Sequence, residues 1–171
     1  MNTNSVRFFN DQDLKPVCKN CEIILAAWEI KNPSNLGKII RLGHNLGAEK
    51  ILFVNDEPAY RESKIKKTAG FSFEQTTWEI LSKDSFYSII NSSGHELVVL
   101  ETCEGAKNIY YEKLPEEMIL LAGNESHGLP PEIIQKSSQQ VFIPMPGGCK
   151  SMNVSQALSV AGFEWYRQQT V

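Results

Sequence analysis

The chain has 171 residues, of which 42% are hydrophobic and 22% are charged, and its formal net charge is −3. This length argues for one domain with a single core rather than two domains. No apolar run approaches the roughly 18 residues that span a bilayer, and no early segment has the pattern of a secretory signal. We therefore expect a cytoplasmic protein with no membrane partner. The acidic balance argues mildly against nucleic-acid binding through bulk charge, but it leaves room for a local basic patch.

Apolar, β-rich runs alternate with segments of helical period, which is the pattern of a parallel α/β sheet. We expect residues 1–20 to form an irregular N-terminal arm and residues 21–171 to form a single domain. The runs at 98–100 and 119–122 lack polar alternation, which indicates central strands covered on both faces. The expected strands are Ile23–Trp28, Ile51–Val54, Gln75–Ile80, Leu97–Glu101, Met118–Ala122 and Val141–Pro144.

Cys18 and Cys21 have the spacing of half a zinc site or of a redox motif. A zinc site would need a second close pair of Cys or His, which the sequence lacks. A thioredoxin-like motif should open a helix, whereas Cys21 leads directly into a strand-like run. We therefore expect free structural thiols and no bound metal.

The segment NPSNLGKIIRLGHNLG predicts an amphipathic helix that contains two glycines. Its apolar face consists of Leu36, Ile39, Ile40, Gly43 and Leu46. A glycine inside a helix costs roughly 1 kcal/mol relative to alanine, so Gly37 and Gly43 indicate the close approach of another backbone or of a ligand. Arg41 would project beside that contact. The alternative is that Ser34 or Asn35 caps the helix and that Arg41 is only solvated.

The segment LLAGNESHGLPPEII follows a buried strand that ends at Ala122, and Pro130–Pro131 predicts the start of a helix. Ligands of open α/β sheets sit at the carboxyl ends of the strands, which is the place of this loop. Glu125 is therefore a candidate for a fixed polar role, unless it only accepts backbone hydrogen bonds within its own loop. We expect His127 to be a surface residue rather than a base.

The segment VFIPMPGGCKSMNVSQA reads as a buried strand, a glycine-rich loop and the start of a helix. Such a connection exposes backbone N–H groups at a helix N-terminus, where a polar ligand can be held. We expect Ser151 to cap this helix and Asn153 to lie in its first turn, where its amide can both donate and accept. The apolar stripe of the helix consists of Val154, Ala157, Leu158, Ala161 and Trp165.

Several familiar chemistries are absent from the sequence. It contains no G-x-x-x-x-G-K-[ST] phosphate loop, no G-x-G-x-x-G after the first strand, no H-E-x-x-H and no G-x-S-x-G. Simple nucleotide hydrolysis and serine hydrolysis are therefore disfavoured. The run RESKIKKTAG at 61–70 offers a local basic patch, although most such runs are solvated helix faces.

Taken together, the three segments resemble the motifs of the TrmH (SpoU) family of SPOUT RNA 2′-O-ribose methyltransferases. NPSNLGKIIRLGHNLGA resembles the first motif through Asn35 and Arg41, and LLAGNESHGLP resembles the second through Glu125. IPMPGGCKSMNVSQA resembles the third through Ser151 and Asn153. The order and the separations agree over residues 23–168. Three ordered motifs make a chance match improbable.

The resemblance implies a SPOUT-type parallel sheet flanked by helices, with a C-terminal deep trefoil knot, a rare exception to unknotted chains. It implies that S-adenosylmethionine is the cofactor and that the protein is a homodimer, in which the arginine of one subunit reaches toward the cofactor of the other. By motif position, the cofactor contacts should include Thr102, Gly123, Ile143, Met145 and Met152. The family more often has leucine at Met152, and a methionine there should keep the apolar contact.

The implied reaction is methyl transfer to a ribose 2′-OH of RNA, with tRNA favoured over rRNA because the predicted form is small and single-domain. Arg41 would orient the hydroxyl and stabilise developing charge, because a guanidinium stays protonated and is a poor base. The implied catalytic residues are Arg41, Asn35, Glu125, Ser151 and Asn153. The implied RNA contacts are Arg41, Lys66 and Lys67. At position 67 this chain has a lysine where the family usually has an arginine, which puts bidentate phosphate recognition there in doubt.

Two other functions stay open. One is an RNA-binding relative without catalysis, which the acidic charge balance suggests. The presence of all five implied catalytic residues argues against it. The other is a SPOUT enzyme that methylates a base, which the ribose-type third motif disfavours.

Overall fold

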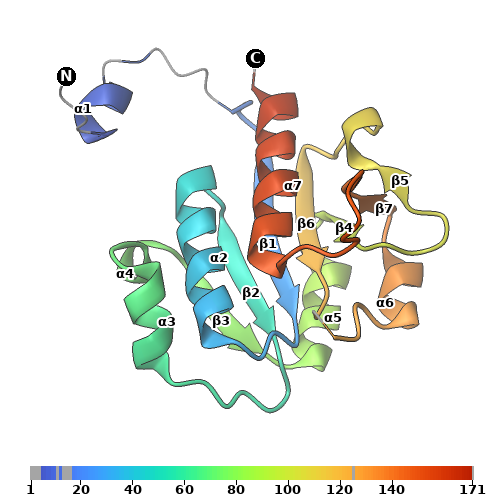
Figure 1. Cartoon of the computed structure of the whole chain (residues 1–171), viewed down its shortest axis with the longest axis horizontal. Coiled ribbons are helices and arrows are strands. Elements are labelled where there is room, and N and C mark those ends of the chain that lie inside the picture. Colours follow the sequence, from blue (N-terminus) through green and yellow to red (C-terminus); the bar gives the residue numbers. More distant parts are fainter. Residues whose placement is uncertain (1–4, 11, 13–16, 125, 171) are drawn as a thin grey trace.

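The structure is a computed structural model that describes residues 5–10, 12, 17–124 and 126–170 (Figure 1). Its centre is a seven-stranded sheet with the strand order β3-β2-β1-β6-β4-β7-β5, in which every pair is parallel. The strands are β1 (Glu22–Trp28), β2 (Lys50–Val54), β3 (Trp78–Leu81), β4 (Glu96–Leu100), β5 (Lys107–Asn108), β6 (Glu117–Ala122) and β7 (Gln139–Phe142). The helices are α1 (Ser5–Asn10), α2 (Pro33–Leu46), α3 (Glu62–Ala69), α4 (Ser72–Gln75), α5 (Lys83–Ser92), the short 3₁₀ helix η1 (Ile109–Tyr111), α6 (Pro131–Lys136) and α7 (Val154–Gln169).

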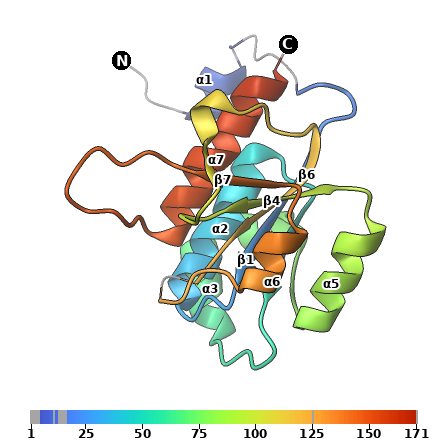
Figure 2. The same ribbon diagram turned by 90° about the vertical axis from the view of Figure 1, so that its right-hand side faces the viewer.

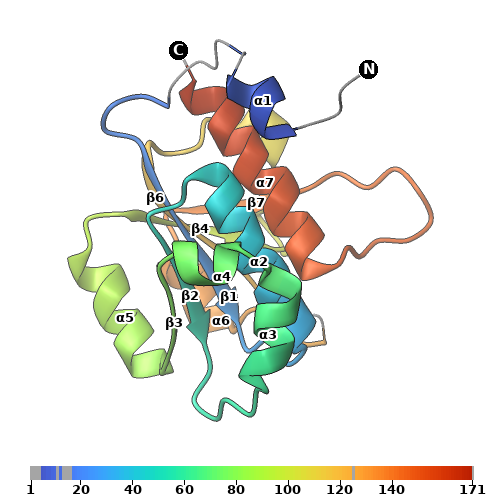
Figure 3. The ribbon, with the colours of Figure 1, turned by 90° about the vertical axis from the view of Figure 1, so that its left-hand side faces the viewer.

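Helices cover both faces of the sheet. Helices α2, α3 and α7 lie on one face, and α5 and α6 lie on the other (Figures 2 and 3). Alternate residues of β1 explain this arrangement, because side chains of a strand point to opposite faces. Leu25 belongs to the core shared with α2, α3 and α7, whereas Ile24 belongs to the core shared with α5 and α6. The predicted parallel α/β sheet, with central strands buried on both faces, is confirmed, while the trefoil knot stays a prediction.

The glycines of α2 mark close packing. A Cβ atom on Gly37 would lie 2.6 Å from the carbonyl oxygen of Ile65 and 2.7 Å from Cβ of Thr68, both in α3. A Cβ atom on Gly43 would lie 2.5 Å from Cδ1 of Ile51 in β2. The predicted close approach of another backbone is therefore confirmed at Gly37, whereas Gly43 packs against side chains.

Two expectations about secondary structure are wrong. The strand expected at Gln75–Ile80 begins only at Trp78, because Ser72–Gln75 forms the helical turn α4. This turn is held by the indole of Trp78, whose Nε1 donates to the carbonyl of Phe73 at 3.2 Å. The arm expected to be irregular contains α1 at Ser5–Asn10. Strand β5 was not predicted, because two residues are too few to show a pattern.

The expectation of free thiols at Cys18 and Cys21 is also wrong, because the structure joins them in a disulfide. The backbone N–H of Cys21 donates to the carbonyl of Cys18 at 3.1 Å, and this turn brings the two Cα atoms to 5.2 Å, within the range that a disulfide spans. The N–H of Cys18 also donates to the carbonyl of Gln169 at 3.0 Å. The segment before β1 is thereby tied to the end of α7.

Within the described part of the chain, no helix combines the length and the apolar character needed to cross a bilayer.

Candidate active site

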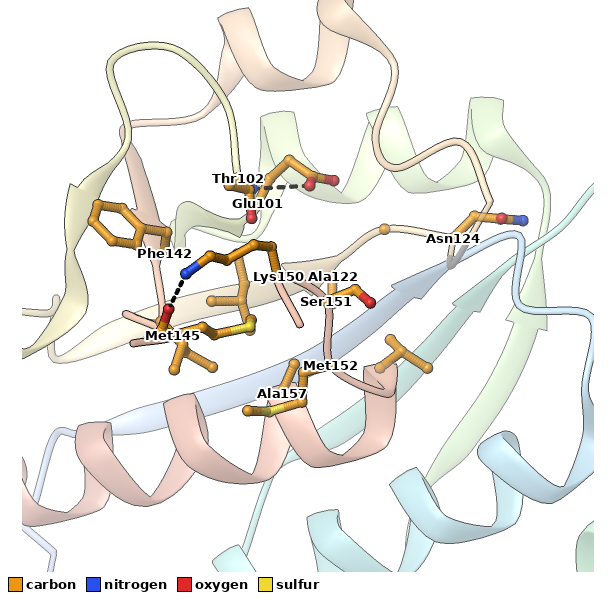
Figure 4. A pocket seen from close by; sticks show the side chains of 14 residues that line it. Glu101, Thr102, Ala122, Asn124, Phe142, Met145, Lys150, Ser151, Met152 and Ala157 are labelled. Atoms are coloured by element: carbon orange, nitrogen blue, oxygen red, sulfur yellow. Dashed lines mark hydrogen bonds between the residues drawn. The ribbon is translucent and has the colours of Figure 1, made fainter. Parts of the chain in front are cut away.

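A cavity of about 300 Å³ opens at the carboxyl ends of β4, β6 and β7 (Figure 4). Its floor and walls come from three strand ends, from the loop after β7 and from the first turn of α7. This is the edge at which open parallel sheets bind ligands. The residues that line it are Leu100, Glu101, Thr102, Ala122, Gly123, Asn124, Phe142, Ile143, Met145, Lys150, Ser151, Met152, Val154 and Ala157.

The cavity brings together the residues that the motifs assign to the cofactor. All five of them line it, although they come from three separate parts of the chain: Thr102, Gly123, Ile143, Met145 and Met152. Ser151, assigned to catalysis, lies on the same wall and is exposed. Parallel strands end at the same edge of a sheet, which is why residues so distant in sequence meet here.

The cap of α7 is Asn153, so the expectation that Ser151 caps this helix is wrong. The Oδ1 atom of Asn153 accepts hydrogen bonds from the backbone N–H and the hydroxyl of Ser155, at 3.1 Å and 2.6 Å. The helix begins at Val154, whose side chain is buried, and this places the cap one position before it. Ser151 is thereby left in the loop, free to face the cavity.

Asn35 and Asn153 are in direct contact. The Nδ2 atom of Asn153 donates to Oδ1 of Asn35 at 3.2 Å, and Asn35 is only 2% exposed. The alternative in which Ser34 or Asn35 caps α2 is wrong, because Asn32 accepts the N–H of Ser34 at 2.9 Å and is the cap. The first turn of α2 and the N-cap of α7 are therefore joined beside the cavity by an amide pair in which Asn35 is buried.

Two lining residues were not singled out by the sequence. The carboxylate of Glu101 accepts the N–H of Thr102 at 2.9 Å and the N–H of Leu129 at 3.1 Å, which ties the end of β4 to the loop after β6. Asn124 is buried, and its Nδ2 donates to the carbonyl of Glu29 at 2.8 Å. Each follows a central strand directly or by one residue, and that position could have marked both as candidates.

The glycine-rich loop is braced at its base. The ammonium of Lys150 donates to the carbonyl of Met145 at 2.8 Å, across the loop from one side to the other (Figure 4). The neighbouring thiol of Cys149 is exposed, and its hydrogen bond with the backbone of Ser151 lowers its pKa. At the end of β4, burial raises the pKa of the Cys103 thiol. We therefore expect the thiols of Cys103 and Cys149 to differ in reactivity.

Arg41 lies outside the cavity lining. It is exposed on α2 and makes no ion pair with any side chain that the structure describes. Lys66 and Lys67 are exposed in the last turn of α3, and the ammonium of Lys66 lies 2.6 Å from a carboxylate oxygen of Glu74. This hydrogen bond raises the pKa of Lys66. Glu125 is outside the described residues, so its assigned role stays a prediction.

His127 is exposed, as expected for a surface residue. The helix expected after Pro130 is present as α6.

Comparison with known proteins identifies the family. A 23S rRNA (guanosine-2′-O-)-methyltransferase RlmB from Haemophilus influenzae is 28% identical over 163 residues, which cover 94% of this chain and 66% of that protein. The fold matches that of an AdoMet-bound rRNA methyltransferase from Sinorhizobium meliloti with a TM-score of 0.82 and 24% identity, over 93% of this chain and 60% of that one. The chain thus spans about two thirds of these relatives.

A second solved structure, described as giving "Structural insights into the 2-OH methylation of C/U34 on tRNA", matches with a TM-score of 0.77 and 26% identity. The match covers 87% of this chain and 97% of that one. The family model of the SpoU rRNA Methylase family matches residues 22–163, which include all three motifs. The chain therefore belongs to the SpoU rRNA methylase family.

Proposed function

We propose that this protein transfers a methyl group from S-adenosylmethionine to a ribose 2′-OH of RNA. The observation that carries the proposal is the cavity at the strand ends, where five motif-assigned cofactor residues and Ser151 lie together. The names of its relatives, which describe 2′-O-methyltransferases of rRNA and 2-OH methylation of tRNA, support the same reaction class.

The residues of the cavity fit S-adenosylmethionine. Its volume of about 300 Å³ is at the lower end of the range for small-ligand pockets. Leu100, Ile143 and Val154 give it apolar walls, and Glu101 and Thr102 add polar groups at one side. Such walls suit a ligand with a flat ring and charged ends. When bound there, S-adenosylmethionine supplies a methyl group that its sulfonium makes electrophilic.

The protein must then place the ribose hydroxyl in line with the methyl group and assist the loss of its proton. We assign Ser151, which is exposed on the cavity wall, to a contact with the ribose. The hydrogen bond between Asn153 and the buried Asn35 holds the loop that carries Ser151. We assign Arg41 to the ribose and its neighbouring phosphate, because a protonated guanidinium orients and stabilises charge.

Arg41 requires a second copy of the chain to act in this way. It is exposed on α2 and does not line the cavity of its own chain. The proposed enzyme is therefore a homodimer, in which Arg41 of one protomer reaches the cavity of its partner. Lys67, which is also exposed, is proposed to contact RNA.

The proposed substrate is tRNA. The supporting observation is the match to the solved structure whose description concerns 2-OH methylation of C/U34 on tRNA. This match extends over 97% of that chain. In the rRNA methyltransferase from Sinorhizobium meliloti, the match covers only 60% of the chain. The region that matches this protein thus makes up nearly all of the chain whose description concerns tRNA, but a smaller part of the rRNA methyltransferase.

Nucleoside mass spectrometry tests the reaction and the substrate together. tRNA and rRNA from cells lacking the gene are compared with wild type, and one 2′-O-methyl nucleoside should be lost from tRNA. Loss from rRNA would contradict the choice of tRNA, and loss of a base-methylated nucleoside would contradict the reaction. Calorimetry with S-adenosylmethionine adds a separate readout, since no binding at millimolar ligand would indicate an RNA-binding protein without catalysis.

The role of Arg41 has a matched control on the same helix. Arg41→Ala should abolish methyl transfer while leaving S-adenosylmethionine binding unchanged, and Lys38→Ala, also exposed on α2, should keep both. Mixing Arg41→Ala with Ser151→Ala protein should restore part of the activity if each active site uses two chains. Near-normal transfer by Arg41→Ala would contradict the assignment.

A further inference from the structure

Three side chains with metal-binding atoms meet at the edge of the sheet opposite the cavity. Glu22 is the first residue of β1, Glu49 immediately precedes β2, and His95 immediately precedes β4. One carboxylate oxygen of each glutamate and one ring nitrogen of the histidine all lie within 4.8 Å of one another. These residues have no part in the proposed methyl transfer.

His95 is the unusual member of this group. Its side chain is only 8% exposed, and its Nε2 atom is buried without a hydrogen-bond partner among the described residues. The Nε2 atom faces the two carboxylates, at 3.4 Å from Glu49 and 3.7 Å from Glu22. A buried polar atom without a partner is rare and indicates that something else completes its surroundings.

The other ring nitrogen fixes the orientation of the imidazole. Nδ1 of His95 lies 3.3 Å from the carbonyl oxygen of Ser93. A carbonyl oxygen only accepts, so Nδ1 carries a hydrogen, and in the neutral form of the ring Nε2 then has the lone pair that an ion can use. Histidines that bind metals through Nε2 commonly donate their Nδ1 hydrogen to a backbone carbonyl in this way.

The spacing matches a metal site better than a salt bridge. Ligand atoms about 2.0–2.1 Å from a tetrahedral zinc ion lie about 3.3–3.4 Å apart. A charged N–H···O hydrogen bond is shorter, at about 2.7–2.9 Å. The separation of 3.4 Å from Glu49 agrees with the first geometry, and that of 3.7 Å from Glu22 is slightly longer. A proton on Nε2 or a metal ion would each relieve the repulsion among these groups, and nitrogen-15 NMR distinguishes the two.

We propose that Glu22, Glu49 and His95 bind a divalent transition-metal ion, Zn²⁺, with water as the fourth ligand. Imidazole and carboxylate are both ligands of zinc. The two glutamates are about half exposed, at 56% and 48%, so an ion can enter and their side chains can adjust to it. The ion joins the beginnings of β1, β2 and β4, and its role is structural.

This proposal departs from the expectation of no bound metal. That expectation rested on the lack of cysteines and histidines close together in sequence. The three ligands here are far apart in sequence and meet only because parallel strands begin at the same edge of the sheet.

A zinc titration of the full chain with a chromophoric zinc indicator tests the proposal. Reduction of the Cys18–Cys21 disulfide would give a second group of metal-binding atoms with Glu116, so the titration uses a Cys18→Ser/Cys21→Ser variant. We expect one Zn²⁺ per chain. His95→Gln should weaken binding by at least about tenfold, whereas His127→Gln, which removes an exposed histidine, should leave it unchanged.

Thermal unfolding gives a second readout. At a Zn²⁺ concentration 100 times Kd, the midpoint should rise by about 5–10 °C, and this rise should be lost in His95→Gln. If His95→Gln fails to fold, Glu49→Gln replaces it, since Glu49 is half exposed and its substitution leaves the core intact.

Nitrogen-15 NMR of the imidazole distinguishes the ion from an ordinary salt bridge. A neutral His95 ring whose Nε2 resonance shifts on addition of Zn²⁺ is the expected result. A His95 ring that stays protonated in saturating Zn²⁺ would overturn the proposal. Zinc binding that is the same in His95→Gln, Glu49→Gln and the parent protein would overturn it as well.

Discussion

Replacing Asn153 should reveal two separable contributions to the free energy of unfolding, one from its N-cap and one from its hydrogen bond with Asn35. Its Oδ1 caps α7 by accepting the N–H of Ser155 at 3.1 Å, and its Nδ2 donates to the buried Asn35 at 3.2 Å. Asn32 provides the matched control, because it caps α2 by accepting the N–H of Ser34 at 2.9 Å and its own side chain is exposed. Comparing the two asparagines isolates the contact with Asn35.

The expected magnitudes follow from these contacts. Loss of an N-cap costs about 1 kcal/mol, and loss of a buried hydrogen bond costs about 1 kcal/mol more. Asn153→Ala should therefore lower the free energy of unfolding by about 2 kcal/mol, and Asn32→Ala by about 1 kcal/mol. Asn153→Asp keeps the cap but loses the donor, so its cost should be about 1 kcal/mol or less, whereas Asn32→Asp should be nearly neutral.

Urea unfolding measures these differences from the midpoints and slopes of the transitions. A double-mutant cycle that pairs Asn35→Ala with Asn153→Ala should give a coupling energy of about 0.5–1 kcal/mol. Equal costs for Asn153→Ala and Asn32→Ala, together with no coupling, would refute the reasoning. The hydrogen bond between Asn35 and Asn153 would then contribute nothing to the link between α2 and α7.

Three further outcomes are expected. Gly37→Ala should destabilise the fold by about 1–3 kcal/mol in urea unfolding, because its methyl group meets the backbone of α3, whereas Gly162→Ala meets a flexible leucine side chain and should cost less. Iodoacetamide labelling followed by mass spectrometry should modify Cys149 at lower pH than Cys103, since hydrogen bonding lowers the pKa of the first thiol and burial raises that of the second. Equal pH profiles would contradict this. A hydrogen bond from an arginine lowers the pKa of Glu164 below the ordinary 4.5 in the folded state, so its stabilising effect is complete above that value and is lost as the pH falls through the folded pKa. Glu164→Gln should therefore cost about 1 kcal/mol at pH 7, and its difference from wild type in urea unfolding should shrink below pH 4.5.

The sequence predicted the sheet well because its central strands are buried on both faces. Runs such as Val98–Leu100 contain only apolar residues, which leaves few alternatives to a central strand. It failed at Gln75–Ile80, where the burial of Phe73 against Trp78 forms a helical turn. The ring centroids of this pair are 5.2 Å apart, and such a contact has no local pattern.

The site was predicted through its motifs but not through its local geometry. Ser151 and Asn153 are both good capping residues, and only in the folded chain does Asn153 accept the N–H of Ser155, with α7 beginning at Val154. The hydrogen bonds of Glu101 join two loops that are distant in sequence. The group around His95 was missed for the same reason, because its members meet only at the edge of the folded sheet.

Helix α2 carries one residue that supports the cavity of its own chain and one residue that we propose to act in the cavity of a second chain. Asn35 and Arg41 are six positions apart on this helix, which places them about 120° apart around its axis. Asn35 is accordingly buried against Asn153, while Arg41 faces solvent. The same rigid helix thus carries a residue that fixes the glycine-rich loop of its own chain and a residue available to the partner. A change at Asn35 should therefore disturb the cavity directly, whereas a change at Arg41 should leave the cavity intact and act only on the proposed transfer.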